Sequence, residues 1–146
     1  MKLYFRKCRP DAVIPQRATP DSAGMDLTAC VDAPVTIEPG KRALIPTGLC
    51  AAPETNDVVL LIYGRSGLAV KHGITLANAV GVVDADYRGE ICVPLINLGE
   101  EPFTVENGMR IAQLVVSPVL LPECVAADAL PDTIRGAGGF GSTGVS

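Results

Sequence analysis

The last residues of the chain carry side chains suited to gripping an anion and a planar ring. Residues 135–144 contain five glycines, and among them stand Arg135, Phe140, Ser142 and Thr143. Ordering so many glycines costs more backbone entropy than burial returns, so the segment cannot hold a core of its own. We expect a lid that orders over a ligand, and an unstructured terminus is the alternative.

A second block, residues 78–90, combines an apolar strand with acids and a tyrosine at the following bend. A hairpin of this kind can offer backbone N–H and C=O groups to the edge of a planar heterocycle, and Asn78 adds a side-chain amide. Asp84 directly follows Val82 and Val83, where a strand ends, which is a position suited to a general base. An acidic surface turn is the alternative.

A glycine–arginine–serine–glycine block brings a cation, a hydroxyl and the start of a predicted helix to one point. Arg65, Ser66 and the Gly67 amide suit phosphate oxygens, because the first amides of a helix have no internal partner. A simple N-capped turn is the alternative. Asp26 and Gln113 stand in two further short blocks, and each has an ordinary interpretation as a turn acid or a strand residue.

The elements that position these residues must be short. The longest stretch without glycine or proline is ten residues, 54–63, whereas a typical helix needs about eleven. Turn dipeptides at 39–40 and 107–108 separate short β-favouring runs. We therefore predict an all-β fold, a jelly-roll-like distorted β-barrel or sandwich. The predicted strands are 35–38, 43–45, 58–63, 74–76, 91–98, 103–105 and 111–119.

One short helix is predicted over residues 66–71, with Ser66 capping its start and Gly73 ending it. We expect one domain, with residues 1–122 as the β-barrel body and 123–146 as a linker and a flexible glycine-rich lid. No internal repeat divides the chain.

Composition excludes several classes of function. The chain of 146 residues is 48% hydrophobic, but no apolar run approaches the ~18 residues of a membrane span, and no signal peptide opens it. We expect a cytoplasmic protein with no membrane partner. The net charge of −4 argues against a nucleic-acid binder, so a polyanionic ligand must meet a local arginine cluster.

Cysteine and histidine usage excludes other chemistry. The five cysteines are widely spaced, without zinc-ligand or redox spacing, and we expect reduced, mostly buried thiols. The single histidine, His72, excludes His-rich zinc sites and argues against a Ser-His-Asp triad. We expect His72 on the surface.

Taken in order, the five blocks resemble the five motifs of the trimeric dUTPases, the deoxyuridine triphosphate nucleotidohydrolases. The resemblance covers nearly the whole chain, and its third and fifth motifs are highly specific. Gly67 stands where many relatives carry serine, a variant that keeps the backbone N–H. The matching segments are 23–27, 64–69, 81–90, 108–113 and 135–144.

The resemblance implies hydrolysis of dUTP to dUMP and pyrophosphate, with water attacking the α-phosphorus. Asp84 matches the family's general base, and Gln113 would place phosphate or water. Mg²⁺ would be held chiefly by the three phosphates, with Asp26 touching its hydration shell. This chemistry depends mainly on positioning and charge neutralisation.

The resemblance also implies how the nucleotide is read. Asn78 and the backbone of the third motif would bond the uracil edge, Tyr87 would pack beneath the deoxyribose, and Phe140 would stack on the base. A core position is the alternative for Tyr87. The implied substrate-binding residues are Arg65, Ser66, Gly67, Asn78, Val82, Val83, Tyr87, Cys92, Arg135, Phe140, Gly141, Ser142 and Thr143.

In this family three chains build each site, so the resemblance implies a homotrimer whose tails close over neighbouring pockets. Two alternatives remain at this point. One is a dCTP deaminase of the same fold, and the other is a catalytically silent nucleotide-binding trimer. The position of Asp84 argues against both, because it belongs to the phosphate-hydrolysing pattern.

Overall fold

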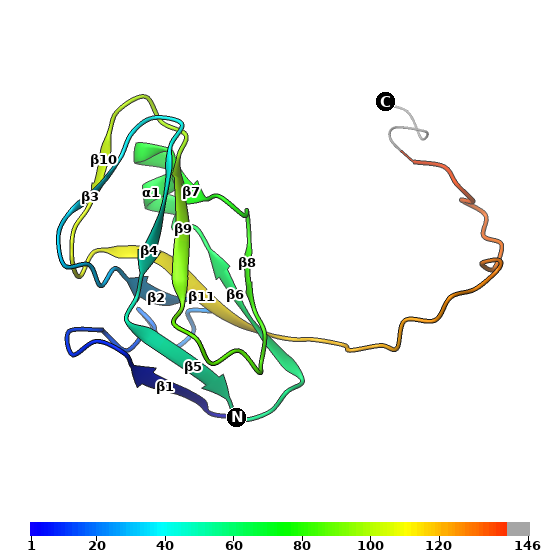
Figure 1. Ribbon diagram of the computed structural model, residues 1–146. Coiled ribbons are helices and arrows are strands. Elements are labelled where there is room, and N and C mark those ends of the chain that lie inside the picture. Colours follow the sequence, from blue (N-terminus) through cyan, green and yellow to red (C-terminus); the bar gives the residue numbers. More distant parts are fainter. Residues whose placement is uncertain (140–146) are drawn as a thin grey trace.

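Strands make up almost all of the regular structure in the computed structural model, which describes residues 1–139 (Figure 1). The one helix in this part of the chain is α1 (Ser66–His72). The strands are β1 (Leu3–Lys7), β2 (Met25–Thr28), β3 (Val35–Ile37), β4 (Arg42–Pro46), β5 (Leu49–Pro53), β6 (Val58–Tyr63), β7 (Ile74–Leu76), β8 (Gly81–Val83), β9 (Cys92–Asn97), β10 (Phe103–Val105) and β11 (Arg110–Pro118).

The strands form four antiparallel sheets around one core. The largest has the order β2-β11-β6-β8, and a second has the order β4-β9-β7. Two-stranded pairs, β1-β5 and β10-β3, complete the body. The prediction of an all-β fold with one short helix is therefore confirmed, and within residues 1–139 the sheets do not join into a single closed barrel.

Alternating burial explains why the longer strands form where they do. In β6, Val58, Leu60 and Ile62 are buried and the residues between them are half-buried; β9 buries Val93 and Leu95 in the same way. Successive side chains of a strand point to opposite faces, so one face of each sheet packs into the shared apolar core.

Pro94 lies in the middle strand of its sheet, where a proline would normally remove a ladder hydrogen bond. The Pro94 carbonyl accepts a hydrogen bond from Ala77 N at 2.7 Å, one residue beyond the end of β7. The nitrogen of Pro94 points to the same side as its carbonyl, where β7 has already ended. The missing N–H therefore faces Ala77, just beyond the last residue of β7.

All seven predicted strands are present, with bounds that differ by one residue or less. The predicted turns are also confirmed: Gly40 and Gly108 both adopt left-handed φ angles, of 73° and 78°. The list of predicted ranges omitted β8, which was expected only as the apolar strand that ends before Asp84, and three further strands, β1, β2 and β5. The last of these has the sequence Leu-Cys-Ala-Ala-Pro, whose small residues have little intrinsic β preference.

The start of α1 differs from the prediction. Arg65, not Ser66, is the N-cap residue, with extended φ and ψ of −92° and 130° and no side-chain capping bond. Ser66 is already helical, so its hydroxyl is not in the capping position. The end is as predicted: Gly73 adopts φ 67°, and its N–H bonds to Ala69 O.

After β11 the chain leaves the body. Val119 N donates to Asp57 O at 2.9 Å, and residues 120–139 then run outward without helix or strand (Figure 1). The side chains of residues 120–137 are exposed. No helix within residues 1–139 is long and apolar enough to cross a membrane.

One fully buried amide organises the sheet end nearest α1. Asn97 Nδ2 donates to Ile37 O and to Glu101 O, both at 2.8 Å, and its Oδ1 accepts from Gly99 N at 2.9 Å. These three bonds tie β9 to β3 and to the following turn. A buried carbonyl left without its donor destabilises a protein by more than the bond itself contributes.

We predict that Asn97→Ala lowers the free energy of unfolding by about 2–4 kcal/mol, because it leaves the partners of three hydrogen bonds unsatisfied. Asn56→Ala, in an exposed turn, is the matched control and changes it by no more than about 0.5 kcal/mol. Urea unfolding of both variants at one protein concentration measures the difference. Equal stabilities for the two variants would contradict the structural role of Asn97.

Candidate functional site

The central strand of the largest sheet brings three of the predicted motifs together. In β11, Gln113 lies opposite Asp26 of β2 on one side and opposite Tyr63 of β6 on the other. Arg65 follows β6 by two residues and begins α1. Strand register alone therefore places the first, second and fourth motifs side by side.

The Asp26 carboxylate holds two arginines. Arg65 Nε donates to Asp26 Oδ1 at 2.9 Å, and Arg110 Nη1 donates to Asp26 Oδ2 at 3.1 Å. Arg65 Nη1 also donates to the Arg110 carbonyl at 3.3 Å. The shared carboxylate keeps two positive groups close together that would otherwise repel each other.

The Gln113 side chain is fixed from both ends. Its Nε2 donates to Gly64 O at 2.9 Å, at the junction between β6 and α1. A Cβ added at Gly24 would lie only 2.4 Å from Gln113 Oε1, which is too close for two non-bonded atoms. Glycine at position 24, inside the first motif, is therefore required for this placement of Gln113.

The N-terminus of α1 is exposed beside Asp26 and Gln113. The first intrahelical bond is donated by Ala69 N to Arg65 O, so the amides of Ser66 and Gly67 have no partner within the helix. A Cβ on Gly67 would meet nothing within 4 Å. Both residues are exposed, and their amides and the serine hydroxyl are available to an anion.

These groups line one cavity of about 680 Å³. The cavity holds three cationic residues and one carboxylate, so it is locally positive on a chain whose net charge is −4. The predicted arginine cluster is thus present. The lining residues are Ala18, Ser22, Ala23, Gly24, Asp26, Arg65, Ser66, Gly67, Leu68, Lys71, His72, Arg110 and Gln113.

Sequence reasoning gave no role to Arg110, Lys71 or His72, although all three line this cavity. Arg110 stands inside the fourth motif, three residues before Gln113, and regular alternation would place the two side chains on opposite faces of the strand. The irregularity between Arg110 and Ala112, which the sequence does not reveal, accompanies their common position at the cavity. Lys71 and His72 occupy the last turn of α1. His72 is exposed, as predicted, and its ring lies 5.2 Å from the ring of Phe103.

The third motif forms a different cleft, of about 320 Å³. Tyr87 Oη donates to Glu90 O at 3.0 Å, and the ring leaves no room for a Cβ at Gly89. Tyr87 is 46% exposed, so the alternative of a core position is wrong. The cleft is lined by Leu44, Val82, Val83, Asp84, Tyr87, Glu90, Ile91 and Cys92.

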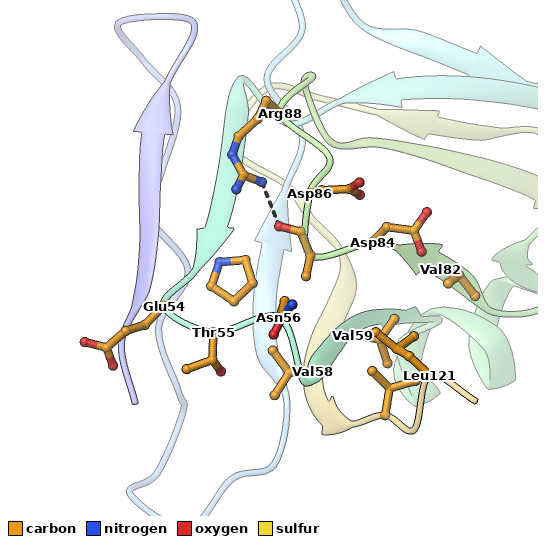
Figure 2. A pocket seen from close by; sticks show the side chains of 13 residues that line it. Glu54, Thr55, Asn56, Val58, Val59, Val82, Asp84, Asp86, Arg88 and Leu121 are labelled. Atoms are coloured by element: carbon orange, nitrogen blue, oxygen red, sulfur yellow. Dashed lines mark hydrogen bonds between the residues drawn. The ribbon is translucent and has the colours of Figure 1, made fainter. Parts of the chain in front are cut away.

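Asp84 stands between this cleft and a larger cavity of about 870 Å³. Figure 2 shows Asp84 and Asp86 following Val82 along one wall of the larger cavity, with Arg88 Nη1 bonded to Ala85 O at 2.7 Å. Asp84 is exposed. The side-chain acids that form ion pairs in the described chain are Asp26, Asp32, Glu54 and Glu90, so the Asp84 carboxylate is not neutralised by a cation there.

The predicted hairpin of the third motif is wrong in its pairing. β8 pairs with β6, whereas β9 pairs with β4 and β7, so the acidic turn joins two different sheets. β8 spans only three residues, and its ladder with β6 uses all of them. Asn78 is exposed in the turn between β7 and β8 and lines neither of the two site cavities.

The structure does not bring all predicted site residues together in one chain. The cationic cavity and the Asp84 cleft have no lining residue in common. Arg135 lies in the outward-running segment, where its Nε donates to Gly138 O at 2.9 Å. Four predicted substrate-binding residues, Phe140, Gly141, Ser142 and Thr143, lie outside the described residues.

Metal ligands are sparse in this arrangement. Within residues 1–139, no three His, Cys, Asp or Glu side chains gather as a metal-binding group. Asp26 is the one carboxylate among the residues that line the cationic cavity, and both of its oxygens accept hydrogen bonds from arginines.

Comparison with known proteins connects these features. Residues 11–144 match the family model described as dUTPase. A deoxyuridine 5'-triphosphate nucleotidohydrolase of Desulfitobacterium hafniense is 56% identical over 143 residues, which cover 98% of this chain and 94% of the relative.

Solved structures agree. A mutant dUTPase of Staphylococcus bacteriophage 80alpha with dUpNHpp superposes with a TM-score of 0.87, at 26% identity and 99% coverage of both chains. A mutant dUTPase from phage phi11 of S. aureus, described for its coordination of a structural Mg(II) ion, has a TM-score of 0.80. It is 23% identical, and the match covers 90% of this chain and 100% of the phage protein.

The fold and the relatives agree with the resemblance of the five sequence motifs. The chain belongs to the dUTPase family.

Proposed function

We propose that this protein hydrolyses dUTP to dUMP and pyrophosphate. The observation that carries the proposal is the exposed Asp84 carboxylate, which borders a base-sized cleft and is not neutralised by a cation of the described chain. The cationic cavity supplies the complementary half, since a triphosphate needs several cationic and amide donors.

Asp84 acts as the general base in this proposal. It accepts a proton from water as the water oxygen bonds to the α-phosphorus and the bond to the pyrophosphate oxygen breaks. An exposed carboxylate without an ion-pair partner remains able to accept that proton. Gln113, held against Gly64, helps to position the phosphate or the water.

Arg65, Ser66 and the Gly67 amide bind the phosphate chain. Asp26 engages only Nε of Arg65, and Nη1 bonds the Arg110 carbonyl, so further guanidinium N–H groups remain for phosphate. Because the ion pairs already orient the guanidinium groups, little reorganisation is needed when the substrate binds. Arg110 joins this set as a second cation beside Asp26.

The residues of the cationic cavity fit Mg²⁺ only if the substrate supplies most of its ligands. One carboxylate, Asp26, is present, and it can reach the ion through a water molecule. When bound, Mg²⁺ would neutralise negative charge on the phosphates. The rest of the mechanism depends on the chain's own residues.

The Asp84 cleft reads the base and the sugar. The backbone of Val82 and Val83, together with Cys92, lines the cleft and would face the uracil edge. Tyr87 would pack beneath the deoxyribose and exclude a 2′-hydroxyl. Asn78 would add its amide from the neighbouring turn, and Phe140 would stack on the ring from the tail.

A homotrimer with shared sites reconciles the two separate cavities. In this arrangement the Asp84 cleft of one copy would face the cationic cavity of a second copy. Residues 120–134 support such contacts, because they carry large apolar side chains that are fully exposed in the single chain. These are Leu120, Leu121, Val125, Leu130 and Ile134.

The C-terminal segment supplies the third part of each site. We assign residues 1–122 to the body and 123–146 to a linker and lid, since β11, the last strand within residues 1–139, ends at Pro118. Arg135, Ser142 and Thr143 would hold the terminal phosphate, next to Gly141. The two alternatives, a dCTP deaminase and a silent binder, have less support, because the named relatives are dUTP hydrolases.

We predict that Asp84→Asn lowers kcat by about 10²–10⁴-fold and leaves the affinity for a non-hydrolysable dUTP analogue within about threefold. The amide keeps the shape of the side chain and loses the ability to accept the proton. Asp86→Asn, in the same exposed turn, is the matched control and keeps near-normal turnover. Pyrophosphate release and calorimetric titration separate the two effects; unchanged kcat in Asp84→Asn would refute the assignment.

Truncation after Ile134 tests the lid. We predict a folded protein of unchanged oligomeric state whose kcat/KM is lower by at least about a hundredfold, because it lacks stacking and phosphate contacts. Size-exclusion chromatography with light scattering checks the assembly. Normal turnover of dUTP by the truncated protein would rule out a catalytic tail.

Mixed trimers test site sharing. We expect Arg65→Ala and Asp84→Asn each to leave very little turnover alone, whereas co-expression of the two should restore about a quarter of wild-type activity. Each shared site would draw its Asp84 and its Arg65 independently from two chains. A mixture of Asp84→Asn with an Arg65→Ala/Asp84→Asn double variant is the control and stays inactive. If the first mixture is equally inactive, the sites are not shared between these two residues.

A further inference from the structure

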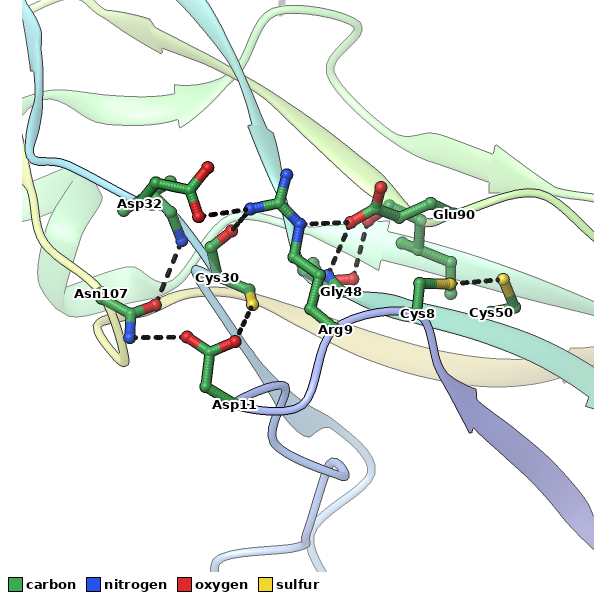
Figure 3. A network of polar contacts seen from close by, with 12 residues as sticks. Cys8, Arg9, Asp11, Cys30, Asp32, Gly48, Cys50, Glu90 and Asn107 are labelled. Carbon is green, nitrogen blue, oxygen red and sulfur yellow. Dashed lines mark hydrogen bonds and ion pairs between the residues drawn. The ribbon is translucent and has the colours of Figure 1, made fainter.

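Two cysteines that are far apart in sequence meet in the folded chain. Cys8 and Cys50 are separated by 42 positions, and their sulfur atoms lie 2.9 Å apart (Figure 3). All five cysteines in the structure are free thiols, as expected, but only Cys30 and Cys50 are buried. Cys8 is exposed, Cys50 is only 5% exposed, and the pairing of β1 with β5 brings them together.

The strand register accounts for the contact. Arg6 lies opposite Cys50, and Cys8 N donates to Gly48 O at 2.7 Å, which continues the ladder by one residue. Cys8 and Cys50 are therefore diagonal neighbours on adjacent strands, a relation in which side chains can meet. No movement of either strand is needed to bring the two sulfurs into contact.

The other cysteines differ from this pair. Cys30 is buried and donates to Asp11 Oδ1 at 3.3 Å, while Cys92 lines the Asp84 cleft. Cys124 is exposed in the outward-running segment. In residues 1–139, Cys8 and Cys50 are the one pair of sulfurs within hydrogen-bonding contact.

A small cavity of about 170 Å³ adjoins Cys50 and contains two arginines, Arg6 and Arg88. Arg6 Nη2 donates to Cys50 Sγ at 3.3 Å. Two guanidinium groups beside a thiol favour the approach of a reagent that carries carboxylates.

We propose that Cys8 and Cys50 form a reversible disulfide by exchange with an anionic low-molecular-weight disulfide. The site is separate from the catalytic groups proposed above. The bond would close the β1–β5 ladder at the end of β1 and fasten the N-terminal strand, which pairs with no other strand in the described chain.

The exchange takes two steps. The Cys8 thiolate, which is exposed, attacks one sulfur of the reagent and releases the first small thiolate, leaving a mixed disulfide on Cys8. The Cys50 thiolate then attacks the Cys8 sulfur and releases the second small thiolate. Two cysteine thiols are oxidised, one reagent disulfide is reduced to two thiols, and the two cysteine protons pass to the released thiolates.

The surroundings of Cys8 make the exchange slow at neutral pH. Its hydrogen bond with Cys50 and some desolvation by neighbouring atoms raise the pKa of the Cys8 thiol, Arg6 lowers it, and Glu90 raises it. A raised pKa means a smaller thiolate fraction, so exchange accelerates as the pH increases. The test therefore measures the thiol–disulfide equilibrium after long incubation, and not the rate of exchange.

The test equilibrates the intact protein in buffers of oxidised and reduced glutathione, then blocks free thiols and identifies linked peptides by mass spectrometry. We expect the effective concentration of the Cys8 and Cys50 thiols toward each other to be at least about tenfold higher in the native protein than in concentrated urea. Excess reduced glutathione should restore both thiols.

Two variants make the result specific. Cys124→Ser, which removes the exposed tail thiol, should leave the Cys8–Cys50 equilibrium unchanged. Cys8→Ser should abolish the internal link and leave at most a mixed disulfide; because position 8 is exposed, folding is retained and is checked by circular dichroism. An effective concentration in the native protein equal to or below that in urea would overturn the proposal, as would a dominant link through any other cysteine.

Discussion

The Asp26 carboxylate is the interaction on which the cationic cavity depends. Arg65 comes from the start of α1, and Arg110 from the beginning of β11, and their guanidinium groups would repel each other at this separation. The acid of β2 bonds one nitrogen of each and fixes their directions. In the function we propose, a phosphate would meet cations that are already oriented, so that little reorganisation accompanies binding.

The register of the β2–β11 ladder positions the groups of the cationic cavity. Asp26 and Gln113 are opposite each other in the β2–β11 ladder, which also contains an irregularity between Arg110 and Ala112. A one-residue slip would turn every side chain of the strand to the other face. The buried residues Ile111, Ala112 and Leu114 oppose such a slip, so the apolar core indirectly protects the chemistry.

Much of this could be predicted from the sequence, for reasons that differ by element. Short β-favouring apolar runs between turn residues identified β6 and β9, and glycine identified the end of α1. The strand β5 escaped notice because Cys50 and its alanine neighbours show no β preference; tertiary pairing with β1 makes it a strand. Likewise, the local composition around Asp84 cannot reveal that β8 and β9 belong to different sheets, because partner choice depends on the distant strands β4 and β6.

The same limit applied to the site. Arg65, Asp26 and Gln113 could be grouped through motif order, but the bonds from Arg110 to Asp26 and from Cys8 to Cys50 join residues 84 and 42 positions apart. No periodicity within one element encodes such contacts.

The buried amide of Asn97 has one more consequence. It fixes Gly99, whose backbone approaches Gly73 so closely that a Cβ at position 73 would lie 2.4 Å from Gly99 N, and Leu98 N bonds Gly73 O at 2.9 Å. The last turn of the seven-residue helix is thus clamped to an interior side chain, although the helix buries no residue of its own. Any change that loosens this turn would therefore also affect the opposite end of the short helix, where Ser66 stands.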